Sequence, residues 1–178
     1  FEKGLQTRID KIEYLNKEIS SYLIKVNNQD LDDKQSVEVF TLVSVVNNIN
    51  SIKNSVKLRL HDLLIKKESE SSVLSDAVIL EVESYHKKMV KQIKRLGKFF
   101  EKYDRVKIDK IIAKGKKYKD LEEKYRIESI QRSDKSDQSN EEKTSPIYLE
   151  LMDMLKEISI FIDIIAQRLS ELETINEN

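Results

Sequence analysis

The sequence predicts an all-α fold, an up-and-down antiparallel helical bundle of about five long helices. Only three glycines and one proline occur in 178 residues, which is too few turn formers to punctuate many strands. Apolar residues recur at steps of three and four through most of the chain, as the buried face of a helix requires. The breaks between these stretches are short, so consecutive helices are expected to run antiparallel and share one core.

The bounds of each helix follow from its apolar stripe and from the polar run that ends it. The run at 27–36 is rich in Asn and Asp, which favour turns and N-caps. Near the C-terminus, Thr144 or Ser145 is placed to cap a helix whose first residue is Pro146. We therefore expect helices over Glu2–Asn27, Asp33–Lys66, Val73–Tyr103, Asp104–Ile130 and from Pro146 onward, with 133–143 as a polar, disordered loop.

The helix that begins near Val37 is expected to organise the chain, and a later helix repeats its layout. Its predicted stripe is Leu42, Val46, Ile49, Ile52, Val56, Leu60 and Leu63. A shift of 109 residues places Leu42 over Leu151 and Asn54 over Asp163. This indicates one domain over 1–178 with two similar halves, about 1–103 and about 104–178, the second lacking its last helix. Chance likeness between two amphipathic helices is the alternative.

Composition and motifs exclude several classes of function. Lys plus Arg and Asp plus Glu balance at 32 each, so no net charge directs the chain to nucleic acid. The sequence has no cysteine, and it carries no phosphate-binding glycine loop or nucleophile motif. His61 and His86 have no acidic partner at a ligand spacing and are expected on the surface. We therefore predict a protein that is not an enzyme and that uses no cofactor.

Two stretches, LVSVVNNINSIKNSV and SPIYLELMDMLKEISIFID, resemble the signature helices of PhoU-like domains. The third helix, SDAVILEVESYHKKMVKQI, extends the resemblance, which is strongest to the PhoU-like region at the cytoplasmic C-terminus of bacterial sodium/phosphate cotransporter-type proteins. The resemblance implies a regulatory domain at the cytoplasmic face of the inner membrane, within a longer protein. Its implied partners are the membrane part of that transporter or a signalling protein, with a homodimer as a further option. A structural helical-bundle or coiled-coil scaffold unrelated to phosphate is the alternative.

The chain departs from the family where metal would bind. Family members carry acidic residues four apart on each signature helix, so that two facing helices hold a metal cluster. The corresponding positions are Asn50 and Asn54 in the first stretch and Ser159 and Asp163 in the second. Amides are poor ligands for such ions, and one carboxylate cannot neutralise a cluster. We therefore predict that the metal site has been lost.

Three features remain open to a structural or a functional interpretation. Asp163 lies in the apolar run ISIFIDIIA, so it must reach solvent, pair with Asn50, Asn54 or Lys53, or bind an ion. Asn47, Asn50 and Asn54 either form interhelical hydrogen bonds or face water. The third helix has a basic face that either contacts anionic lipid or a partner, or is simply solvated: Lys87, Lys88, Lys91, Lys94, Arg95 and Lys98.

Overall fold

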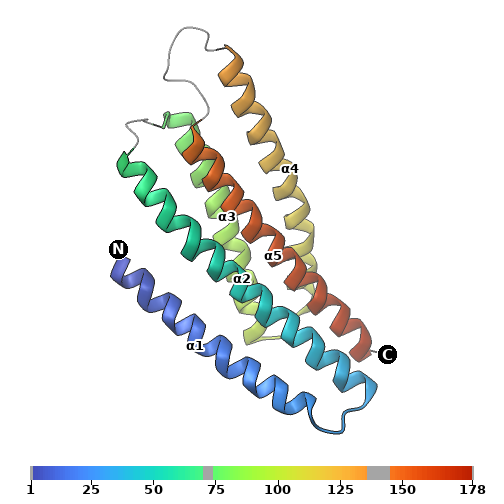
Figure 1. Ribbon diagram of the computed structural model, residues 1–178. Coiled ribbons are helices and arrows are strands. Elements are labelled where there is room, and N and C mark those ends of the chain that lie inside the picture. The colour runs from blue at the N-terminus through green and yellow to red at the C-terminus, as the bar shows by residue number, and fades with distance from the viewer. Residues whose placement is uncertain (1, 70–73, 136–144, 178) are drawn as a thin grey trace.

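The computed structural model describes residues 2–69, 74–135 and 145–177, and these form five helices and no strand (Figure 1). The prediction of an all-helical chain is confirmed. The first helix has the predicted bounds, while the fourth extends past Ile130, so that residues 133–135 of the predicted loop are helical. The rest of that loop, 136–143, lies outside the described residues. The helices are α1 Glu2–Asn27, α2 Asp33–Ser69, α3 Asp76–Glu101, α4 Arg105–Lys135 and α5 Pro146–Glu177.

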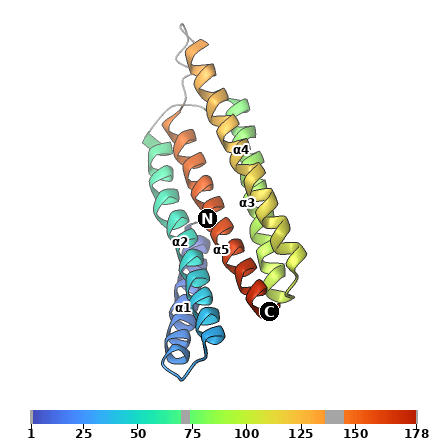
Figure 2. The same cartoon turned by 90° about the vertical axis from the view of Figure 1, so that its right-hand side faces the viewer.

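Consecutive helices run in opposite directions along one common axis (Figures 1 and 2). Helix α1 packs only on α2, which packs on α5, and α5 packs on both α3 and α4. In both views the turn between α1 and α2 projects past the corner that joins α3 to α4. The α1–α2 hairpin is therefore covered on one side along only part of its length.

Helix α5, and not α2, is the centre of the molecule. It contacts α2, α3 and α4, and its side chains enter both buried apolar clusters. One cluster joins α5 to Val45, Phe99 and Ile108, and the other joins it to Tyr85 and Met89. The expectation that the helix from Val37 organises the chain was wrong. Helix α5 packs on three helices and α2 on two, so α5 buries more of its surface.

The predicted stripe of α2 is only partly correct. Leu63 is buried, but Ile49 is 38% exposed. Val45 and Lys53, both outside the predicted stripe, are buried. The reason is that α2 lies between α1 and α5, so it buries two separate faces, and a single-stripe pattern describes neither of them completely.

Side chains cap two of the helices. Asp32 Oδ1 accepts a hydrogen bond from the Gln35 backbone N–H at 2.8 Å, and Gln35 Oε1 accepts one from the Asp32 N–H at 3.1 Å, which together form a capping box for α2. Asp104 Oδ1 accepts from the Val106 N–H at the start of α4, at the predicted corner. Ser75 and Ser145 precede α3 and α5, but their hydroxyls make no capping hydrogen bond among the described residues.

The two predicted halves match only partly in environment. Val45 and Met154, which the 109-residue shift superposes, are both buried, and so are Leu63 and Leu172. Ile49 is exposed, however, whereas the superposed Ile158 is buried. The internal duplication therefore stays a prediction.

Candidate functional site

The two helices with the PhoU-like motifs pack against each other, but in the described part of the chain no hydrogen bond joins Asn50 or Asn54 to Asp163 Oδ1. Helices α2 and α5 form an extensive antiparallel contact, in which the Ser55 hydroxyl donates to Glu157 Oε2 at 3.0 Å. Asp163 instead lies against Gly115 of α4. The pairing of Asp163 with Lys53 does not occur, because Lys53 Nζ binds Glu13 of α1 at 3.0 Å.

The asparagines of α2 make no interhelical hydrogen bond among the described residues. Asn47 and Asn54 are exposed and Asn50 is partly buried. Asn48 Nδ2 donates to the Ser44 carbonyl of its own helix at 2.7 Å. Within the described ranges no group of three or more His, Cys, Asp or Glu side chains is placed to hold a metal ion.

Asp163 is a carboxylate in a tight apolar contact. Its Oδ1 is buried and has no hydrogen-bond partner within the described part of the chain. A Cβ atom added at Gly115 would overlap the carboxylate, at 2.6 Å from Cγ, so the Asp163 side chain can occupy this position against α4 because residue 115 is a glycine. Burial raises the pKa of Asp163 to about 6.

Tyr85 adds a second unsatisfied polar atom to the interface of α3, α4 and α5. Its ring is fully buried, and its hydroxyl has no hydrogen-bond partner among the described residues. Burial raises the pKa of Tyr85 to about 12, partly offset by the nearby Ser159 hydroxyl, while Glu122 and Asp163 add to the rise. Ser159 and Asp163, two of the four degenerate motif positions, are thus turned toward α3 and α4.

Gly115→Ala is expected to lower the free energy of unfolding by about 1–2 kcal/mol, because overpacking outweighs the ~1 kcal/mol that alanine gains in helix propensity. Urea unfolding followed by circular dichroism measures the change. In an Asp163→Ala background the obstructing carboxylate is gone, so the same substitution should be neutral or stabilising. Equal losses in both backgrounds would show that the contact between Gly115 and Asp163 does not limit the approach of the helices.

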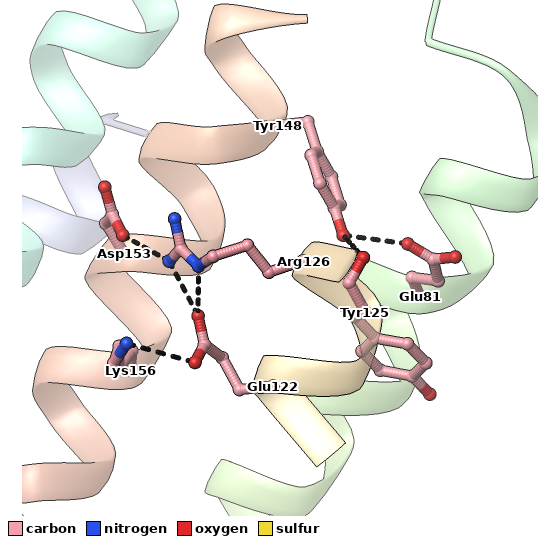
Figure 3. Close-up of polar contacts among 7 residues, drawn as sticks. All are labelled: Glu81, Glu122, Tyr125, Arg126, Tyr148, Asp153 and Lys156. Carbon is pink, nitrogen blue, oxygen red and sulfur yellow. Dashed lines mark hydrogen bonds and ion pairs between the residues drawn. The ribbon is translucent and has the colours of Figure 1, made fainter. Parts of the chain in front are cut away.

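An ion-pair network centred on the buried Glu122 connects α4 to α5 (Figure 3). Glu122, only 2% exposed, accepts hydrogen bonds from Arg126 at 2.6 and 3.0 Å and pairs with Lys156 at 3.1 Å. Arg126 also donates to Asp153 at 2.7 Å. The hydrogen bonds to Asp153 and Glu122 raise the pKa of Arg126 above its ordinary value.

A second set of contacts connects α3 to α4 and α5 (Figure 3). The Tyr148 hydroxyl donates to Glu81 Oε2 at 2.8 Å, and the Tyr125 carbonyl lies 3.4 Å from the same hydroxyl. Arg132 binds both carboxylate oxygens of Glu81, at 2.7 and 3.0 Å. Burial and the contact with Glu81 raise the pKa of Tyr148. Every charge in these two sets has an opposite partner, and the contacts join α3, α4 and α5.

An apolar groove lies among α1, α2 and α3. Each helix lines it with four residues at positions i, i+3, i+4 and i+7, beginning at Leu5, Ile49 and Ile93. The groove has a volume of about 440 Å³. Among the described residues that line it, the charged ones are Arg8 and Lys53. We call it the α1–α2–α3 groove.

Beyond this groove, α1 exposes a row of large apolar side chains. Leu15, Ile19 and Tyr22 are 45%, 44% and 66% exposed. Their spacing of four and three residues places them on one face of the helix, which we call the α1 outer stripe. Ile9 and Leu23 of the same helix are buried, so the exposed stripe lies between two buried positions of α1.

The basic face of α3 is largely exposed, as predicted. Lys87, Lys91, Lys94 and Lys98 are exposed, and Lys87 pairs with Glu83 at 2.8 Å. Lys88 and Arg95 are partly buried and bind Ser84 and Gln92. His61 and His86 are exposed, which confirms that prediction. Among the described residues, nothing else about the basic face distinguishes a binding surface from a solvated one.

Sequence reasoning missed Gly115, Glu122 and the groove. Gly115 is one of only three glycines, and a glycine within a helical pattern signals a close approach of another element. Glu122 gave no signal, because its spacing to Arg126 is also that of an exposed helical pair. The sequence shows the lining of the groove only as apolar residues on three separate helices. Whether these helices enclose a groove depends on the tertiary arrangement.

Comparisons with protein-family models, with curated proteins and with solved structures give no match. Within the described ranges, none of the helices combines the length and the hydropathy that a membrane span needs. The fold and the geometry of these surfaces therefore carry the functional argument.

Proposed function

We propose that this chain is a non-enzymatic regulatory domain of a sodium-dependent phosphate transporter-like protein, acting through helix–helix contacts. The α1 outer stripe is the observation that carries the proposal. Leu15, Ile19 and Tyr22 lie in the half of α1 that is nearer the turn to α2, and no other described helix packs on α1 besides α2. A row of exposed large apolar side chains is typical of a surface that another protein covers.

The partner in this proposal is a helix in the membrane part of the same transporter, which places the domain at the cytoplasmic face of the inner membrane. The resemblance to PhoU-like regions of sodium/phosphate cotransporters supports this choice, and so does the packing of the two motif-bearing helices against each other. Contact with the transporter would bias transport according to phosphate supply. The degenerate motif means that the domain acts without a metal.

A photo-crosslinking residue at Ile19 of the native protein, in its own cells, tests the partner. We expect it to capture a polypeptide with several apolar spans, identified by mass spectrometry. The same residue at Lys119, an exposed position on α4, should not capture it. Crosslinks only between copies of this chain, or only to soluble filament or scaffold proteins, would overturn the transporter assignment and favour a homodimer or the scaffold alternative.

Metal analysis tests the other half of the proposal. Protein purified without added metal is expected to contain only substoichiometric Zn, Fe or Ni by mass spectrometry. Among the described residues Asp163 belongs to no group of three or more His, Cys, Asp or Glu side chains that could hold a metal ion. A stoichiometric metal that is lost on Asp163→Ala would contradict the prediction that the metal site is lost.

A further inference from the structure

We propose that the α1–α2–α3 groove binds a single-chain amphiphile with an anionic head group, of the long-chain carboxylate class. This goes beyond the docking function and does not rest on it. The groove and the α1 outer stripe share no residue, so each proposal can fail alone.

The groove has the size of a small-ligand site. The lining residues cover two turns of each helix, a length of ~10 Å. The groove has about 440 Å³, within the range of about 300–1,000 Å³ that small-ligand sites show. One flexible acyl chain suits a groove of this size between three helices.

The lining is suited to such a chain. Apart from Arg8, Lys53 and Gly97, every lining side chain is aliphatic or aromatic. Gly97 leaves open space, since a Cβ atom added there meets nothing within 4 Å. Placing a chain of methylenes against these side chains removes apolar surface from water on both partners. The groove thus gains most from a ligand that is long, flexible and apolar.

The charge around the groove selects the sign of the head group. Arg8 has no ion pair among the described residues, and no acidic side chain lines the groove. Glu13 is shared by Lys53 and Lys57, each at 3.0 Å, so these three residues together keep one positive charge. A carboxylate head group at the mouth of the groove could pair with the guanidinium of Arg8. Guanidinium and carboxylate groups form strong charge-assisted hydrogen bonds with each other.

Titration with sodium dodecanoate below its micelle concentration tests the proposal. Calorimetry is expected to show one saturable site, and the methyl resonances of Ile9, Ile52 and Ile93 should shift on binding. Dodecyltrimethylammonium has the same chain and the opposite charge, and it should bind at least about tenfold more weakly. Equal affinity for the two would overturn the charge argument.

Matched variants locate the site. Gly97→Leu fills the groove and should abolish binding while the helix content and thermal midpoint are kept or raised, because glycine is a poor helix former. Gly4→Leu changes an exposed glycine on α1 that also has open space around it, and it should leave binding intact. Arg8→Glu should weaken dodecanoate binding about tenfold or more, and Lys11→Glu, on an exposed turn of α1, by less than about twofold.

Three results would overturn the proposal. The first is no saturable binding of dodecanoate by the folded wild-type chain. The second is binding that survives Gly97→Leu in a folded variant. The third is binding to anionic phospholipid vesicles without any binding of monomeric dodecanoate, which would make this side of the molecule a membrane contact and not a ligand site.

Discussion

Glu122→Ala is expected to lower the free energy of unfolding by about 3 kcal/mol, the largest loss from any single substitution proposed for this chain. Glu122 is almost fully buried and is the shared acceptor of Arg126 and Lys156 (Figure 3). Its removal takes one carboxylate acceptor away from Arg126 and Lys156, which lie beside the apolar core. Losing one partner of a buried pair costs about 3–5 kcal/mol, because the remaining charge is desolvated without compensation.

The lower end of that range applies here for two reasons. Arg126 keeps its contact with Asp153 at 2.7 Å, and both cations are about one-third exposed, so water screens them after the substitution. Denaturant unfolding of Glu122→Ala and of the exposed neighbour Glu123→Ala measures the effect, and the second variant should change stability by less than about 0.5 kcal/mol. Similar changes in the two variants would show that the network does not stabilise the α4–α5 interface.

Asp163→Asn is expected to raise the free energy of unfolding at pH 7.5 by about 1–2 kcal/mol. The pKa of Asp163 rises from 3.8 to about 6 on folding, because the carboxylate is buried beside Gly115. A rise of that size corresponds to ~3 kcal/mol for a fully buried group. The carboxylate is only partly buried, so solvent screening reduces the expected gain to about 1–2 kcal/mol.

The pH dependence has a definite sign. The folded chain holds the Asp163 proton more tightly than the unfolded chain, so stability from this group is full below pH 3.8 and is lost as pH rises through about 6. The Asp163→Asn variant has no carboxylate to ionise, so it does not lose stability in this way as pH rises. The difference in free energy of unfolding between variant and wild type should therefore be largest above pH 7 and shrink toward pH 4. A difference that stays constant across this range, or that grows as pH falls, would contradict the buried-carboxylate account.

Much of the fold was predictable because its causes are local. The step of three and four between apolar residues sets a helix wherever it occurs, and the polar run at 27–36 ends one helix and caps the next through Asp32 and Gln35. The first helix has the predicted bounds for this reason. The fourth helix ended later than predicted, since a polar segment gives no apolar periodicity to mark its last turn.

The candidate site was predicted less well, as Asp163 shows. The sequence indicated that this carboxylate reaches solvent, binds an ion or pairs with another side chain, and Asn50, Asn54 and Lys53 were the candidate partners. Lys53 lies instead on the side of α2 that meets α1, where it binds Glu13, while Asp163 faces α4. Which face of a helix meets which neighbour depends on the crossing of three or more helices, and no single helix encodes it.

The sequence by itself determined that this protein is a set of long amphipathic helices, and it determined nearly where each begins, because hydrogen bonding and side-chain periodicity act over a few residues. Only the tertiary structure decided that α5 is central, that Asp163 lies against Gly115, and that three apolar stripes surround an open groove. The physical reason is that burial is a property of pairs of surfaces. A stripe can be read along the chain, but its partner is selected only when all five helices pack.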